Sequence, residues 1–190
     1  AIPGGRTLER YAAAVAGDTG AQLREEVAGP IIWCGPVLQL PPPENEIVGY
    51  PMGQLHTLGV RTPGTPPLEA GQLLVEQRPW LFHSIAFAMS AEDFERSGGF
   101  HTDYTGHGLE DADFAEVVRR ADGALVWVGG ATAYLQPDTA PTREEETRIA
   151  VNHARVWHER WGSHPDHPWL SRLVGEGVLQ RADEGGYEAA

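Results

Sequence analysis

Residues 98–114 read GGFHTDYTGHGLEDADF, a glycine- and histidine-rich approach that ends in a cluster of acids. Glu110, Asp111 and Asp113 form the cluster, and Asp103 precedes it. These carboxylates fit the start of a solvated helix, a metal site or an acid/base centre. The surrounding sequence has to decide among the three.

The composition is that of an ordinary globular protein, with 190 residues, 41% hydrophobic and 22% charged. A formal charge of −13 without a basic stripe argues against nucleic acid as the main partner. No apolar run reaches the roughly 20 residues that span a bilayer, and the first residues show no signal-peptide pattern, so we expect a cytoplasmic protein. Cys34 stands alone in an apolar run, which predicts a small buried side chain and no disulfide.

Hydrophobic periodicity predicts an α/β protein with few strands. We expect helices over residues 6–16, 91–97, 110–122 and 143–161, and strands within 27–40, 80–89 and 124–135. Two helix starts carry capping signals, Ser90 with Asp93 and Thr142 with Glu145. Residues 41–71 form a long irregular segment without the character of a linker. We therefore expect one domain over residues 1–182 and a polar, frayed tail over 183–190.

A structural explanation of the acidic cluster is available. Glu110 and Asp111 fall where a helix begins, and acids there complement the helix dipole by roughly 0.3–1 kcal/mol each. That explanation leaves the preceding Gly-His-Gly without a purpose, whereas glycines at 106 and 108 would let the backbone approach a ligand closely. In the functional explanation, one carboxylate takes a proton from a hydroxyl while its neighbour binds other hydroxyls.

Two segments carry a family resemblance. Residues 83–114, HSIAFAMSAEDFERSGGFHTDYTGHGLEDADF, contain Gly-Gly-Phe, a Tyr-x-Gly-x-Gly turn and Glu-Asp-x-Asp-Phe, and residues 152–170 read NHARVWHERWGSHPDHPWL. Both resemble the C-terminal, galactosyltransferase-like half of family 2 inverting glycosyltransferases of the GT-A fold. The likeness extends over nearly the whole chain and implies a mixed sheet flanked by helices, with the N-terminal nucleotide-binding half absent.

The resemblance also implies roles for single residues. Asp111 matches the general base that deprotonates the acceptor hydroxyl, and Glu110 matches the acid that contacts the acceptor sugar. His107, with Gly108 beside it, stands where the family usually places Tyr or Trp as a stacking platform for a sugar ring.

The donor side of the resemblance is carried by another segment. The strand before the Gly-Gly-Phe motif lines the donor-sugar pocket in the family, and it corresponds here to Phe82, His83 and Ser84.

The chain departs from the family in two respects. Leu135 stands near the position of a histidine metal ligand, and leucine cannot coordinate a cation. The Asp-x-Asp metal motif belongs to the family's nucleotide-binding half, which has no counterpart here. A divalent cation, Mn²⁺ or Mg²⁺, is expected for the intact family fold, but its ligands in this chain are unknown. Donor binding would then be missing or supplied by another polypeptide, and the sequence would be part of a longer product. The sheet edge that the missing half would otherwise cover would favour a dimer.

Other clusters of potential ligands are read as structural. His158, His164 and His167 fit no standard zinc spacing and are assigned to surface or packing roles. Trp157 and Trp161 lie four residues apart on one helix face, which favours core packing over a sugar platform. No glycine-rich loop for phosphate is present.

The leading hypothesis is therefore a hexosyltransferase-like enzyme part that moves a sugar from a nucleotide-diphosphate sugar to an acceptor hydroxyl, with Asp111 as the base. The alternative is a non-catalytic carbohydrate-binding or interaction module derived from a glycosyltransferase.

Overall fold

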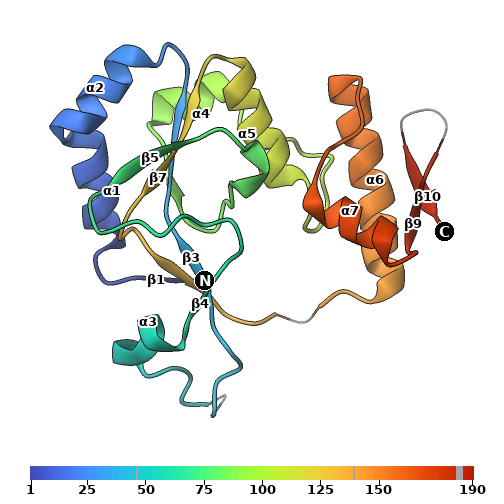
Figure 1. Cartoon of the computed structure of the whole chain (residues 1–190), viewed down its shortest axis with the longest axis horizontal. Helices are drawn as coiled ribbons and strands as arrows, with labels where there is room; N and C mark the ends of the chain where they lie inside the picture. The colour runs from blue at the N-terminus through green and yellow to red at the C-terminus, as the bar shows by residue number, and fades with distance from the viewer. Residues whose placement is uncertain (46, 139, 183–185) are drawn as a thin grey trace. The chain divides into compact units, whose positions relative to one another are not determined.

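The computed structural model describes residues 1–45, 47–138, 140–182 and 186–190. The chain divides into two compact units, and the domain predicted over residues 1–182 stays a prediction. Unit 1 comprises Ala1–Ser97 and Ala115–Asp138, and unit 2 comprises Gly98–Phe114 and Thr139–Ala190. The fold is mixed α/β, with mixed sheets flanked by helices (Figure 1), which confirms the predicted class at that level.

The central sheet of unit 1 has the strand order β5-β7-β2-β6. Its strands are β2 (Ile31–Cys34), β5 (Leu73–Glu76), β6 (Phe87–Ala88) and β7 (Ala124–Val128). β2 and β7 pair in parallel, and the two outer strands are antiparallel to them. Every residue of β2 and β7 is buried, which explains their uninterrupted apolar sequences. Cys34 is buried in β2, as predicted.

The second sheet of unit 1 has the order β1-β8-β3-β4. Its strands are β1 (Ile2–Pro3), β3 (Val37–Gln39), β4 (Val60–Arg61) and β8 (Ala133–Leu135). The chain passes from β2 to β3 through Gly35, where an added Cβ would lie 1.7 Å from the carbonyl oxygen of Ala131. Only glycine fits this close approach of two backbones.

Helices cover the central sheet of unit 1 (Figure 1). They are α1 (Thr7–Ala16), α2 (Asp18–Glu26) and α4 (Ala91–Ser97), together with the part of α5 (Glu110–Arg120) that belongs to this unit, while α3 (Leu55–Leu58) and the 3₁₀ turns η1 (Met52–Gln54) and η2 (Pro79–Leu81) lie in the connections. Tyr11 and Ala14 of α1 pack against Ile31 and Trp33 of β2. The alternation along β2 therefore presents one set of side chains to α1.

Two of the predicted strands are only partly correct. In the expected strand 80–89 only Phe87–Ala88 pairs, because Pro79 opens a 3₁₀ turn that runs to Leu81. The expected strand 124–135 is divided into β7 and β8 near Gly130. Gly130 has a φ of 82°, a conformation that glycine adopts at little cost and that does not continue a strand.

The predicted cap of α4 is half correct. The Asp93 N–H donates to Ser90 Oγ at 3.0 Å, as in a capping box. The Asp93 carboxylate, however, is buried and accepts from Arg24 Nη2 at 2.7 Å and from the N–H of Ile31 at 3.2 Å. It thereby ties α2, α4 and β2 together.

Unit 2 contains α6 (Arg143–Trp161), α7 (Pro168–Gly175) and the antiparallel pair of β9 (Leu179–Arg181) and β10 (Tyr187–Ala189). The capping box of Thr142 and Glu145 that opens α6 is confirmed. The prediction of a frayed tail is wrong for Tyr187–Ala189, since β10 pairs with β9 and Tyr187 is buried; residues 183–185 of that tail lie outside the described part.

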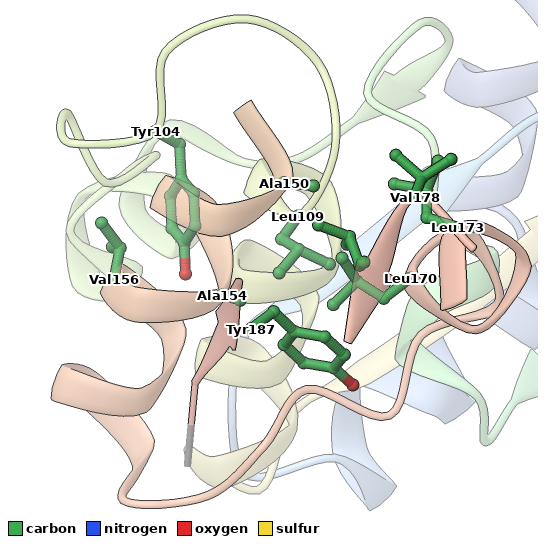
Figure 2. Close-up of a cluster of buried hydrophobic side chains, with 10 residues drawn as sticks. Tyr104, Leu109, Ala150, Ala154, Val156, Leu170, Leu173, Val178 and Tyr187 are labelled. Atoms are coloured by element: carbon green, nitrogen blue, oxygen red, sulfur yellow. The ribbon is translucent and has the colours of Figure 1, made fainter. Parts of the chain in front are cut away.

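The core of unit 2 gathers side chains from α6, α7, β9, β10 and the loop before α5 (Figure 2). Its buried members are Tyr104, Leu109, Ala150, Ala154, Val156, Leu170, Leu173, Val178, Leu179 and Tyr187. Leu109 immediately precedes the first residue of α5, so the start of that helix is anchored in this core.

Within the described ranges, no helix combines the length and the apolar character that crossing a membrane would need.

Candidate functional site

The predicted acceptor residues lie together in unit 2, around the first turn of α5. Glu110 is the first residue of that helix, as predicted, and Asp111 follows it, half-buried. His107 and Gly108 belong to the loop that enters the helix. The acidic cluster is thus the start of a helix, as one of the three explanations of these carboxylates predicted.

A buried carboxylate anchors this helix start. Asp113 is 1% exposed, and its Oδ1 accepts from Tyr104 Oη at 3.1 Å. The same oxygen accepts from Arg160 Nε and Trp161 Nε1, each at 2.8 Å. Three donors around one oxygen join the loop, α5 and the end of α6. Asp113 is therefore a structural residue rather than part of an exposed acidic surface.

A buried histidine holds both ends of the glycine loop. His153 of α6 is 0% exposed, and its Nδ1 accepts from the N–H of Leu109 at 3.2 Å. Its Nε2 lies 3.0 Å from the carbonyl oxygen of Thr105. Because the first partner is a donor and the second an acceptor, the proton must sit on Nε2, and the imidazole is neutral.

The glycines of the loop have separate reasons. Gly106 has a φ of 92°, which side chains rarely adopt. An added Cβ on Gly108 would lie 2.5 Å from the Trp169 ring and 2.8 Å from His153 Nδ1. The close approach that the sequence predicted at Gly108 is thus made, within unit 2, to an indole and an imidazole; a role of Gly108 in acceptor binding stays a prediction.

Glu110 is partly engaged in building its own loop. Its Oε2 accepts from the N–H of Gly108 at 2.6 Å, and its Oε1 lies 3.9 Å from His107 Nδ1. Burial, and secondarily the charge of Asp111, raise the pKa of Glu110 above its usual range. The side chain remains 24% exposed, whereas that of His107 is 95% exposed. The imidazole face of His107 is therefore open to a ligand.

The predicted donor residues lie in unit 1, in the connection between η2 and β6 rather than in a strand. Phe82 is buried and meets Phe87 edge-on, with ring centroids 5.4 Å apart. Its packing position is thereby explained, while His83 and Ser84 are half-buried. A role of these three residues in donor binding stays a prediction.

The expected divalent cation finds no set of ligands in the described ranges. No three or more His, Cys, Asp or Glu side chains there come together as a metal-binding group. Leu135, at the predicted metal position, packs at the edge of a cluster formed by Val37, Ala86 and Ala133. The divalent cation therefore stays a prediction, and no step of the proposed reaction depends on it.

Several of the remaining histidines and tryptophans have packing or hydrogen-bond contacts. Trp157 packs against the core of unit 2, and His167 caps α7 by accepting from the N–H of Trp169 at 3.3 Å. The rings of His158 and His164 lie 6.3 Å apart. A packing role is thus confirmed for Trp157, and His167 has a structural role as a helix cap.

A hollow of about 710 Å³ lies on α6 and β10, lined by Arg148, Val151, Asn152, Arg155 and Glu188 among others. None of the predicted site residues contributes to it.

Sequence reasoning missed His153, the contact of Trp169 with Gly108 and the burial of Asp113. One signal for His153 was available in the sequence, because a helical period places it on the same side of the helix as the small apolar Ala150 and Ala154. In the structure both alanines are fully buried. The pairing of Asp113 with Arg160 joins residues 47 apart and leaves no local signal.

The neutral His153 predicts a loss of stability in mild acid. Burial lowers its pKa below the ordinary value of about 6.5. As the pH falls, the His153 imidazole is therefore protonated in the unfolded chain before it is protonated in the folded one. The stability that the neutral imidazole contributes is complete above about pH 6.5 and is lost as the pH falls towards the lowered pKa. The free energy of unfolding then changes by up to about 1.4 kcal/mol per pH unit. Urea unfolding between pH 7.5 and 5 measures this slope.

The control for this titration is His153→Gln, which lacks the group. Tyr104, whose ring centroid lies 5.0 Å from that of His153, and His107 and Glu110 on the adjoining loop are retained in both proteins, so the difference between the two pH slopes reports the loss of the imidazole. Equal pH slopes in the two proteins would contradict the prediction.

No protein-family model, curated protein or solved structure matches this chain. The family resemblance remains a prediction from the sequence.

Proposed function

We propose that unit 2 carries the acceptor-binding and general-base site of an inverting glycosyltransferase of the GT-A fold, with a nucleotide-diphosphate sugar as donor. The observation that carries the proposal is the pair Glu110–Asp111 at a helix start, beside a rigidly held loop that exposes His107. A flexible surface loop would not keep a base and a platform in one geometry.

Asp111 is the catalytic residue of the proposed reaction. A hydroxyl is a weak nucleophile at neutral pH, so a carboxylate within hydrogen-bond distance assists by accepting its proton as the new bond forms at the anomeric carbon. Placing the acceptor and this base together also removes much of the entropic barrier of a bimolecular step. The sugar–phosphate bond breaks as the nucleoside diphosphate leaves.

Glu110 and His107 bind the acceptor in this proposal. Since Glu110 Oε2 is occupied by the N–H of Gly108, Oε1 is the oxygen through which it would accept from a sugar hydroxyl. The exposed imidazole of His107 offers a small flat face for the apolar side of a sugar ring. Phe82, His83 and Ser84 are proposed for the donor sugar. Mn²⁺ or Mg²⁺ remains an expectation for the intact family fold.

A carbohydrate-binding module without catalysis is the second candidate. The observation in its favour is Leu135, which packs among apolar side chains where the resemblance expects a metal ligand. Such a module would bind the acceptor sugar and would not bind a nucleotide.

One experiment separates the two candidates. A panel of mono- and disaccharides is titrated into the full chain and followed through the backbone amides of residues 105–111, and uridine and guanosine diphosphates are titrated with Mn²⁺ by calorimetry. For the glycosyltransferase we expect saccharide binding at these amides, weakened by His107→Ala, together with nucleotide binding and sugar transfer. Saccharide binding alone supports the module, and no shift of these amides with any saccharide overturns both.

A further inference from the structure

The two ends of the loop of residues 105–109 bond to the same side chain. The carbonyl of Thr105 and the N–H of Leu109 both bond to the imidazole of His153, at 3.0 and 3.2 Å. His107 stands between these two attachment points with its side chain 95% exposed. One buried group on α6 thus closes the loop that displays the proposed sugar platform.

The second attachment point is also the N-cap of α5. The carbonyl of Leu109 accepts from the N–H of Asp113 at 2.8 Å, which is the first bond of the helix. The N–H of the same residue is held by His153. The imidazole therefore fixes the residue from which Glu110 and Asp111 follow directly, and a shift of this cap would move both carboxylates.

The loop packs closely against the rings of His153 and Trp169. The Trp169 ring lies 6.2 Å from that of His153, and no Cβ fits on Gly108 beside the two rings. Trp169 is itself held, because its Nε1 donates to Glu146 Oε1 at 3.0 Å. The loop consequently rests on two immobilised rings of unit 2.

We propose that His153 is the positioning residue of the acceptor site: its neutral imidazole sets the conformation of residues 105–109 and with it the direction of Asp111 and His107. The role of His153 in setting the loop conformation does not depend on the proposed function. Only the consequence for acceptor binding rests on the proposed function.

The test compares the full chain with His153→Ala and His153→Gln by amide hydrogen exchange. Loss of one hydrogen bond of ordinary strength predicts that the Leu109 amide exchanges about tenfold faster in His153→Ala. The amide of Ala154, in the interior of α6, keeps its rate and serves as the internal reference. The glutamine amide carries an acceptor oxygen and an NH₂ donor group, so it offers both kinds of bond that the neutral imidazole makes, and His153→Gln restores part of the protection.

A matched substitution controls for the loss of a histidine from α6. His158→Gln lies five residues away on the same helix, outside the loop contacts described above, and is expected to leave the Leu109 amide unchanged. If amide exchange at Leu109 and Ala154 accelerates equally in His153→Ala, His153 is an ordinary core residue. If exchange at Leu109 does not accelerate, His153 does not hold the loop. Either result overturns the proposal.

Two further measurements keep the proposal decidable. If His153→Ala does not fold, the ¹⁵N resonances of the wild-type imidazole show which nitrogen carries the proton. A proton on Nδ1 overturns the proposal. A proton on Nε2, together with partial protection of the Leu109 amide in His153→Gln, supports it. With acceptor sugars, His153→Ala should raise the dissociation constant about tenfold and His153→Gln less. If the wild type binds no saccharide, the proposed function fails, while hydrogen exchange still tests the role of His153.

Discussion

Replacing Asp111 by asparagine is expected to lower the rate constant of sugar transfer by about 10²–10⁴-fold, the usual contribution of a general base. The amide keeps the shape of the carboxylate but cannot accept the acceptor proton. Acceptor affinity should change little, because Glu110 and His107 are untouched. Initial rates with saturating acceptor, together with the dissociation constant of the acceptor, separate the two effects.

Asp103→Asn is the matched control for this variant. Asp103 is an exposed acid of the same unit, so the substitution makes the same change of charge and shape outside the proposed base position. We expect its transfer rate to stay within about twofold of wild type, since surface charges of this kind are weakly coupled to a site. Full transfer activity of Asp111→Asn would remove the base assignment.

Replacing Asp113 by alanine is expected to lower the free energy of unfolding by roughly 3 kcal/mol or more, in the range measured for broken buried ion pairs. The change leaves Tyr104, Arg160 and Trp161 without the oxygen to which they donate. Arg160 is 26% exposed and can recover some hydration, which places the expected loss at the lower end of about 3–5 kcal/mol. Urea unfolding followed by tryptophan fluorescence measures it.

Glu159→Gln controls for the loss of a carboxylate from an ion pair of the same unit. Glu159 pairs with Arg155 at 2.6 Å across one turn of α6, and both side chains are more than half exposed. Exposed pairs contribute about 0–1 kcal/mol, so this variant should unfold close to wild type. A loss for Asp113→Ala no larger than that for Glu159→Gln would show that the buried carboxylate does not hold unit 2 together.

The fold was predictable from the sequence where the signal was local. The helix starts at Thr142 and Glu110 followed from capping and dipole rules, and β2 followed from its apolar run. The expected strand over residues 80–89 failed because apolar side chains alone do not distinguish a strand from a buried connection, and Pro79 was the neglected breaker.

The candidate site was predictable only in its chemistry. Residue types and order marked Glu110, Asp111 and His107, and the structure brings these residues together at one helix start. The sequence assigned the glycine at 108 to a ligand, whereas its close contacts within unit 2 are Trp169 and His153. Contacts between residues 40 to 60 positions apart leave no trace in a local pattern.

The sequence by itself therefore determined the α/β class, the position of the α5 start and the presence of two adjacent carboxylates there. Tertiary structure alone decided that Asp113 is buried under three donors and that His153 is neutral and holds Leu109. The physical reason is that helix starts and apolar runs depend on interactions within a few residues. The burial of a charge and the tautomer of an imidazole depend on which distant groups the fold places around them.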